Sequence, residues 1–438
     1  MMASMVPAEA DRRLEDFGAT HRVRNELARG SGRIQYGVSL ESQDGEILWS
    51  DTYSGAPLEL FEFQKDAVQK ISSTLGVPDN APGIRVIRLR QNPTEQLEAF
   101  EALSRGQARF WMTGDVFCEQ AMGDFEEAIA LDPSMGLAYL HKGLCLGLQA
   151  WLPELPRDHA LWESAVVNMR RGADLDPSLT RVAYEKIADF EAARNRWKAA
   201  RDALDKANAV DPDAFSFVLD NSTGNCAHVI ERMSKKYELD PLDPLNATLV
   251  SIGYLTCPGM VDREEGLRWV EIARGTQSGG FVDRAIPALL EMGETERASE
   301  IWNETMGVFN MALIEGGVDM EAFRELHFAA LQDQGMVDPF VDRVRELEQQ
   351  GLYQPHLNSF ILIGVGAVDA AYESIFKSIE ANRFNIHDFM QYGEGPAKVR
   401  GDPRFMEVLE RVGLIEYWNE YGLPPICENT ESNEILCI

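Results

Sequence analysis

Ala130-Leu131-Asp132-Pro133 closes an apolar, helix-like stretch, and three later stretches close in the same way. They are Asp174-Leu175-Asp176-Pro177, Ala209-Val210-Asp211-Pro212 and Glu238-Leu239-Asp240-Pro241. Proline ends a helix because it has no backbone N–H and because its ring clashes with the preceding turn. The four endings recur at separations scattered around about 34 residues, which is typical of stacked helix–turn–helix units. The sequence therefore predicts an array of helical hairpins over residues 93–275.

The residues that precede these endings are also similar in size from copy to copy, with alanine or glycine at corresponding positions. The third copy holds the set Tyr184, Ala188, Ala200, Leu204 and Ala207. The first copy holds Ala121, Phe125 and Ala128, and the second holds Tyr139, Gly143, Ala165, Met169 and Gly172. The pattern resembles that of tetratricopeptide repeat (TPR) proteins, and the resemblance implies a mostly α fold, an α-α superhelical solenoid. An ordinary helical bundle with coincidental endings is the alternative.

The array is expected to have drifted from a regular repeat. The second copy is long enough to hold an insertion near residues 151–159, where Pro153 and Pro156 break any helix. The fourth copy is short. Residues 276–422 are expected to form degenerate helical repeats with C-terminal capping helices, and residues 423–438 a loose tail.

Residues 1–92 have a different pattern, which predicts a small α/β module. Residues 8–29 are expected to form a charged helix. Apolar and polar residues then alternate over 34–40, and a second alternating run covers 47–53, so these two runs predict a strand hairpin. A helix is expected from about residue 58 to residue 75, and a short apolar run at 86–89 could add one more strand.

Two stretches of this module carry a second resemblance. Leu48-Trp49-Ser50-Asp51-Thr52-Tyr53 and Leu60-Phe61-Glu62-Phe63-Gln64-Lys65-Asp66 resemble the end of the TolB-like α/β module. That module precedes TPRs in bacterial proteins, many of which carry an adenylate cyclase domain or a winged-helix DNA-binding domain. Gly401-Asp402-Pro403-Arg404-Phe405 and Tyr417-Trp418 resemble the family's closing motif.

The chain departs from the family at its N-terminal end. It begins partway through the module and shows no effector domain. Two interpretations stay open: a shortened, stand-alone member, or a protein whose start lies upstream. The strand edges of a partial module are expected to be covered by the first repeat helices or to pair with another chain, as in a homodimer.

The charge excludes some partner classes. The chain has 41 basic and 71 acidic residues, a net charge of −30. This balance argues against nucleic-acid binding, which needs a basic surface, and against binding to anionic membranes. Acidic residues that keep the outer helix faces soluble are the simplest explanation, and a basic partner is the alternative. No apolar run is long enough to predict a membrane span.

The cysteines contain no C-x-x-C pair. They are Cys118, Cys145, Cys226, Cys257, Cys427 and Cys437. Their scatter through helical sequence indicates small buried hydrophobic residues in a reduced cytoplasm, so the expected location is cytoplasmic. A disulfide between the last two is conceivable.

Catalytic motifs are lacking. The sequence has no H-E-x-x-H pair, no G-x-x-x-x-G-K-[ST] phosphate loop and no G-x-S-x-G elbow. Gly364-Val365-Gly366 lacks the third glycine of a nucleotide-binding loop. Cyclase chemistry also needs metal-binding carboxylates on a dedicated α/β scaffold. We therefore expect no enzyme activity, no cofactor and no catalytic metal.

The expected function is protein binding. A helical solenoid offers a concave groove built mainly by the first helix of each hairpin. The candidate groove residues are His141, Lys142, Arg181, Lys186 and Asn195. For each of them, ordinary surface is the alternative. We expect a non-catalytic scaffold that holds a protein or peptide partner in bacterial signalling or regulation. The alternative is the regulatory or sensory portion of an adenylate cyclase or transcription regulator whose effector domain is absent from this chain.

Overall fold

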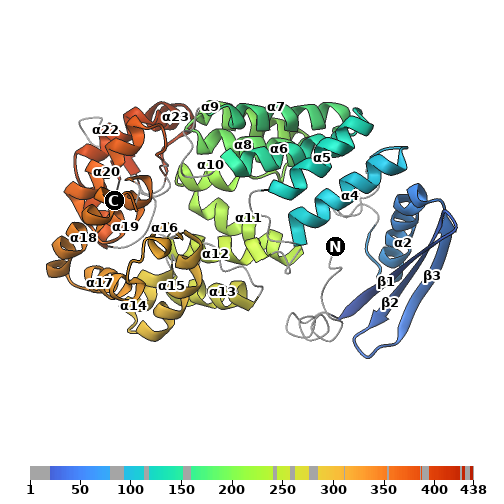
Figure 1. Cartoon of the computed structure of the whole chain (residues 1–438), viewed down its shortest axis with the longest axis horizontal. Helices are drawn as coiled ribbons and strands as arrows, with labels where there is room; N and C mark the ends of the chain where they lie inside the picture. The colour runs from blue at the N-terminus through green and yellow to red at the C-terminus, as the bar shows by residue number, and fades with distance from the viewer. Residues whose placement is uncertain are drawn as a thin grey trace. The chain divides into compact units, whose positions relative to one another are not determined.

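A computed structural model describes most of the chain. The described residues are 20–78, 93–112, 118–150, 159–239, 244–256, 262–275, 285–309, 311–352, 355–384, 386, 394–424, 427–429 and 435–437. The chain divides into two compact units. Unit 1 comprises Met1–Ala150 and Leu161–Tyr184, and unit 2 comprises Trp151–Ala160 and Glu185–Ile438. The fold is mostly helical, with a small antiparallel sheet near the N-terminus (Figure 1).

The sheet of unit 1 has three strands in the order β1-β2-β3. β1 is His21–Gly30, β2 is Arg33–Ser42 and β3 is Ile47–Gly55. The β2–β3 hairpin confirms the predicted strand pair. The helix predicted over residues 8–29 is wrong from His21 onward, because these residues pair with β2 along their whole length. The rest of that prediction, and the short run at residues 86–89, lie outside the described residues.

Helix α2, Leu60–Thr74, packs on one face of this sheet. Ala67 of α2 joins Tyr36 and Val38 of β2 in a small core. Two polar contacts fix the helix to β3: Lys70 Nζ lies 2.8 Å from Asp51 Oδ2, and the Tyr53 hydroxyl donates to Asp66 Oδ2 at 2.8 Å. The alternating burial of β2 follows directly from this one-sided cover.

The helices that follow are arranged largely in pairs. Their bounds are α4 (Leu97–Met112) and α5 (Glu119–Leu131), α6 (Gly136–Ala150) and α7 (Ala160–Leu175), α8 (Thr180–Ala193) and α9 (Trp197–Val210), α10 (Phe217–Ser222) and α11 (Cys226–Leu239), α12 (Pro244–Thr256) and α13 (Arg263–Gly275), α14 (Ile286–Glu291) and α15 (Thr295–Phe309), α16 (Met311–Glu315), α17 (Met320–Gln332) and α18 (Val337–Gln349), α19 (Pro355–Gly364) and α20 (Val368–Glu380), and α21 (Glu394–Arg400), α22 (Arg404–Arg411) and α23 (Leu414–Tyr421).

The Asp-Pro endings have one shared geometry. Asp132, Asp176 and Asp211 take extended backbone angles, with φ of −133°, −133° and −141°. A residue before proline is pushed out of the α region, so each helix ends there. In each turn the Asp carboxylate accepts the backbone N–H two residues later, at 2.9–3.0 Å. We call this arrangement the Asp turn; α6 and α8 begin four residues after the Asp, and α10 begins six residues after it.

The Asp turn also occurs where the sequence analysis did not predict it. Asp333 has φ −134° and accepts the N–H of Gly335 at 2.8 Å, although no proline follows it. Asp402 accepts the N–H of Arg404 at 2.9 Å. A short polar side chain that holds its own backbone is a common turn device. The same turn therefore recurs across both units, whereas the fourth predicted ending, at Asp240, lies outside the described residues.

Small residues allow α6 and α7 to touch through their backbones. A methyl group placed on Gly136 would lie 2.6 Å from the carbonyl oxygen of Gly172. One placed on Gly143 would lie 2.8 Å from the carbonyl oxygen of Ala165. The set of small residues that was predicted for the second copy therefore lies at a helix–helix contact.

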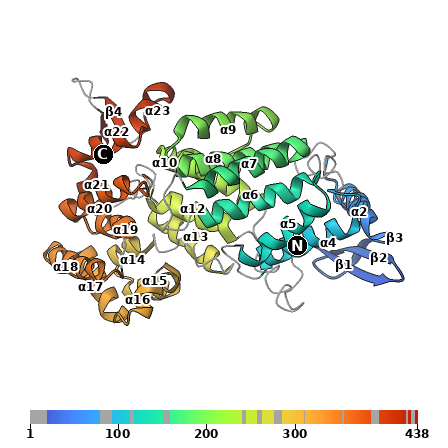
Figure 2. The same cartoon turned by 45° about the horizontal axis from the view of Figure 1, so that its top comes forward.

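Unit 2 contains contacts between segments that are far apart in the sequence. The Trp197 indole N–H of α9 donates to the carbonyl oxygen of Val412 at 2.7 Å. The Trp418 indole N–H of α23 donates to the carbonyl oxygen of Thr223 at 3.3 Å. Figures 1 and 2 show α23 beside α9. A linear stack in which each hairpin contacts only its neighbours would not make these contacts.

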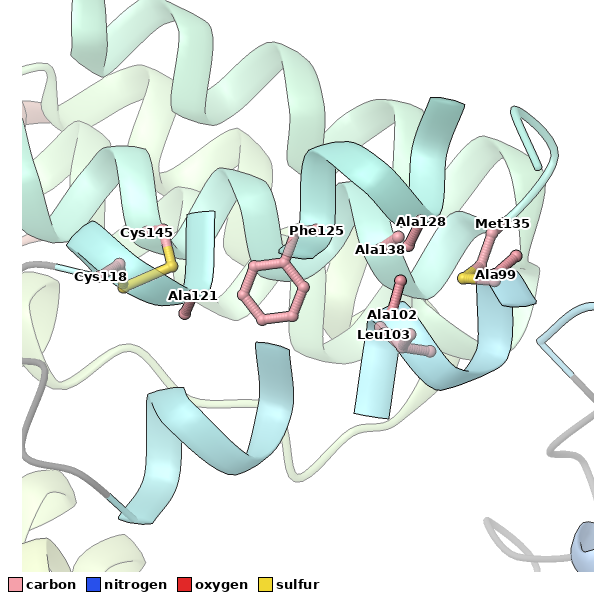
Figure 3. Close-up of a cluster of buried hydrophobic side chains, with 10 residues drawn as sticks. All are labelled: Ala99, Ala102, Leu103, Cys118, Ala121, Phe125, Ala128, Met135, Ala138 and Cys145. Carbon is pink, nitrogen blue, oxygen red and sulfur yellow. A yellow bond between two sulfur atoms is a disulfide. The ribbon is translucent and has the colours of Figure 1, made fainter. Parts of the chain in front are cut away.

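A disulfide corrects the interpretation of the cysteines. Cys118 and Cys145 are bonded, with Cα atoms 5.4 Å apart, at one end of the buried cluster around Phe125 (Figure 3). Cys226 and Cys427 each also belong to a disulfide, and none of the described cysteines is free. The predicted burial of these four cysteines is confirmed, but the prediction that they are reduced is wrong, and with it the reason for expecting a cytoplasmic protein.

The C-terminal segment is more ordered than predicted. β4 (Cys427–Asn429) and β5 (Ile435–Cys437) form an antiparallel pair in which Cys427 lies opposite Cys437. The prediction of a loose tail is wrong for these residues. Among the described helices, none is both long and apolar enough to cross a membrane.

We expect Gly172→Ala to lower the free energy of unfolding by about 1–3 kcal/mol. The new methyl group would lie 2.7 Å from the Gly136 carbonyl oxygen, and backbone cannot move aside cheaply. Gly123→Ala on α5 is the control, since its methyl group meets nothing within 4 Å. Urea unfolding should show a loss for the first variant and none for the second. Equal effects would contradict the close contact.

We expect non-reducing peptide mapping to recover one cross-linked peptide pair that contains Cys118 and Cys145. The Cys118→Ala, Cys145→Ala double variant should be less stable by about 3 kcal/mol, because the bond closes a loop of 27 residues in the unfolded chain. Alkylation of Cys118 in the unreduced, unfolded protein would contradict the disulfide.

Candidate functional site

His141, the first predicted groove residue, belongs to the core of unit 1. It is 7% exposed, and its ring stacks on Phe125 with centroids 5.1 Å apart. Phe110 meets the same ring edge-on at 6.0 Å. Gln107 Nε2 lies 2.9 Å from His141 Nε2. This histidine holds α4, α5 and α6 together and presents little surface to a partner.

The other predicted residues are partly exposed. Lys142 lies on α6 and pairs with Glu126 at 2.9 Å. Lys186 lies on α8 and pairs with Asp189 at 3.1 Å. Arg181 lies in the first turn of α8. Each of the two lysines can therefore contact a partner and already has an acidic neighbour.

Asn195 lies in the turn between α8 and α9. Its φ is +57°, a left-handed conformation that asparagine tolerates better than most residues. Its side-chain Nδ2 donates to the carbonyl oxygen of Phe384 at 3.4 Å. Asn195 thus links distant parts of unit 2. The five candidates are divided between the two units, with His141, Lys142 and Arg181 in unit 1, so they do not form one cluster within either unit.

A buried polar network in unit 2 was missed by the sequence analysis. Asp189 of α8 accepts the Ser216 hydroxyl at 2.7 Å and the N–H of Val218 at 3.2 Å. Glu185, one turn earlier, accepts the N–H of Phe215 at 3.0 Å. Both carboxylates are less than 9% exposed. Asp189 thus accepts an N–H of the first turn of α10, where negative charge is favoured by the helix dipole, and Glu185 holds the backbone just before that helix.

The same network continues through the α10–α11 turn. Asp220 Oδ2 lies 3.1 Å from His228 Nδ1, and Asn225 donates to Asp220 Oδ1 at 2.9 Å. Arg232 Nε donates to His228 Nε2 at 3.0 Å and also pairs with Asp213. An Asp–His pair can orient a general base. Here Arg232 occupies the nitrogen that would take a substrate proton, so the arrangement functions as a structural link.

The outer end of this network is strongly charged. Lys235 lies 2.9 Å from Asp213. Together with Arg232, this lysine lowers the pKa of Asp213 to about 2, so the carboxylate stays ionised at all physiological pH values. The spacing of Asp213, Asp220, His228 and Arg232 in the sequence carries no recognisable motif, which explains why it gave no signal.

Metal and small-molecule sites find little support in the described part of the chain. No group of three or more His, Cys, Asp or Glu side chains there could hold a metal ion. A shallow hollow lies among α18, α19 and α20. Two ion pairs line it: Arg345 with Glu373 at 3.3 Å, and Lys377 with Glu348 at 3.3 Å. These pairs stabilise the contact between α18 and α20.

Ion pairs also join α13 to α15. Arg274 lies 2.8 Å from Glu304, and Arg297 pairs with Glu271 at 2.5 Å. The two pairs connect the second helix of one hairpin to the second helix of the next. Exposed pairs contribute little individually, about 0–1 kcal/mol. Their place in the fold indicates that corresponding helices of successive hairpins lie side by side.

The chain matches no protein-family model and no curated protein. The resemblances to TPR proteins and to the TolB-like module therefore stay predictions.

A buried histidine should make the stability of unit 2 depend on pH. Burial lowers the pKa of His327 to about 4, and its ring stacks on Phe340 at 5.0 Å. The unfolded chain binds a proton near pH 6.5, whereas the folded state does not. Stability from this group is therefore complete above pH 6.5 and is lost as the pH falls towards 4, by roughly 3 kcal/mol.

The measurement is urea unfolding between pH 7.5 and pH 4, with His327→Leu as the matched variant. The difference in unfolding free energy between the two proteins should change by roughly 3 kcal/mol as the pH falls from 6.5 towards 4. A constant difference would show that His327 is not buried in its neutral form.

Proposed function

We propose that this chain is a non-catalytic protein-binding scaffold of the TPR type, an α-α superhelical solenoid whose C-terminal helices return to α9 and which holds a protein or peptide partner. The observation that carries the proposal is the recurrent Asp turn, which follows α5, α7 and α9 with the same hydrogen bond each time. A repeated turn with a repeated hydrogen bond is the expected result of one structural unit used several times.

The burial of the helices supports two layers, as in such a scaffold. No residue of α6 is exposed, and its buried and partly buried residues largely alternate. α7 has a buried stripe and an exposed opposite face. In a superhelical stack the first helix of each hairpin forms the inner, partner-facing layer and the second forms the outer layer. Repeat surfaces of this kind bind extended or helical peptides.

The disulfides support an oxidising compartment as the place where the scaffold works. Disulfides persist in such compartments and are rare in a reduced cytosol. A role in bacterial signalling or regulation rests on the resemblance to the TolB-like and TPR family. The order of a strand module followed by helical pairs also favours the second candidate, the sensory portion of an adenylate cyclase or transcription regulator.

The test is affinity capture with the intact, oxidised chain as bait, followed by binding of the purified partner to variants. Lys142→Ala and Lys186→Ala remove partly exposed cations from the proposed inner layer. We expect each to weaken binding about 10-fold. Lys198→Ala on α9 is the matched control, since this lysine side chain is 73% exposed on the proposed outer layer.

Unchanged melting temperatures would show that these variants fold. Equal affinities for all three variants would contradict the assignment of the inner layer. A captured cyclase or DNA-binding regulator would favour the sensory role, and failure to capture any protein would contradict the scaffold.

A further inference from the structure

Among the residues that the structure describes, no strand pairs with the outer edge of β1. Pairing with β2 runs from His21 to Gly30 without a register shift. Val23 and Leu27 are 49% and 57% exposed, although both lie on the face of the sheet that α2 covers. A long, regular edge strand with exposed apolar residues is a template for pairing with another strand.

The position of α2 explains why β1 is uncovered. α2 contacts β2 and β3. Val23 lies directly opposite Leu40, and Leu27 lies opposite Tyr36. Both of these β2 residues are buried, whereas their neighbours on β1 are not. The apolar side of the sheet therefore extends one strand beyond the helix that covers it.

The other edge is less suited to pairing. The β2–β3 register shifts between Leu40 and Glu41, which marks a bulge, and bulges distort an edge. Asp51 and Tyr53 of β3 already contact Lys70 and Asp66 of α2. β1 has neither a bulge nor a proline.

The residues of β1 are complementary to themselves. The central stretch is Val23-Arg24-Asn25-Glu26-Leu27. In an antiparallel pair of two copies with the symmetry axis at Asn25, Val23 lies opposite Leu27 of the second copy. Arg24 lies opposite Glu26 of the second copy, on the outer face. Directly opposed side chains share a face, so the apolar pairs meet beside α2 and the ion pairs meet on the other side.

Other registers lose this match. An axis at Arg24 would oppose two guanidinium groups, and an axis at Glu26 would oppose two carboxylates. Like charges directly opposite are destabilising. An axis between two residues would place Val23 opposite an outer-face residue and put the two α2 helices on opposite sides. An axis at Val23 or Leu27 would shorten the paired length.

We propose that two copies of this chain associate through β1, forming a continuous six-stranded antiparallel sheet with its two-fold axis at Asn25. The second copy satisfies the outward backbone groups of β1 and covers its two apolar side chains. Arg24, which already bonds to Glu41 at 2.9 Å, gains a second carboxylate from Glu26 of the other copy. A guanidinium group has enough donors for both.

The first test is a charge exchange on the full-length protein, with sedimentation velocity over a concentration series as the readout. Arg24→Glu and Glu26→Arg each turn two attractive pairs into two repulsive ones, so each should weaken the dimer roughly 10-fold or more. The double variant restores opposite charges and should recover dimerisation. A monomer at all concentrations, or single variants that dimerise like the unmodified chain, would overturn the proposal.

The second test fixes the register. In this arrangement the Cβ atoms of the two Asn25 residues lie about 5 Å apart, so Asn25→Cys should cross-link two chains under mild oxidation. His21→Cys is the control, since its two copies would lie about 27 Å apart. No cross-link at position 25, or equal cross-linking at both positions, would overturn the axis at Asn25. The described native cysteines are disulfide-bonded and do not compete.

Discussion

The Asp turn is the interaction on which the helical part depends. A helix leaves its last carbonyl groups and the next helix leaves its first N–H groups without partners. The carboxylate of Asp132, Asp176 or Asp211 accepts the N–H two residues later, in the connection that leads to the next helix. The proline that follows keeps the backbone extended at the Asp. The Asp-Pro pair thus ends one helix and orders the first residues of the connection to the next, in the same way each time.

Within unit 1, close contact between helices follows from residues with little or no side chain. Gly136 and Gly172 bring α6 and α7 to backbone contact. The buried cluster beside them joins α4, α5 and α6 around Phe125 and His141. The Cys118–Cys145 disulfide ties the start of α5 to α6 at one end of this cluster. A histidine that could be read as a binding residue thus serves packing, because aromatic rings enclose it on two sides.

Unit 2 is held together differently. Hydrogen bonds from two tryptophan indoles join α9 and the α10–α11 turn to the C-terminal helices, across about 200 residues of sequence. The conformational preferences of nearby residues do little to bring such distant segments together. Closing so long a loop costs conformational entropy before the contacts form. The buried carboxylates of Asp189 and Glu185 add a second fixed point at the start of α10. The first helices of this unit are therefore held both by their neighbours and by its C-terminal end.

The sequence by itself determined the helical class, the hairpins and their endings, and the β2–β3 pair, because these features depend on residues close together in the chain. Proline, glycine and the alternation of apolar residues act locally, so their effects can be predicted from spacing. Only the tertiary structure decided that Cys118 is disulfide-bonded and that His141 is buried. The same holds for the hydrogen-bond network around Asp220 and for the contact between α23 and α9. Residues 21–30 show the reason most clearly. Their charges suit a solvent-exposed helix as well as an edge strand, and pairing with β2 selects the strand. Contacts between distant residues carry no periodic signal, and their free energy is gained only when the chain is already folded.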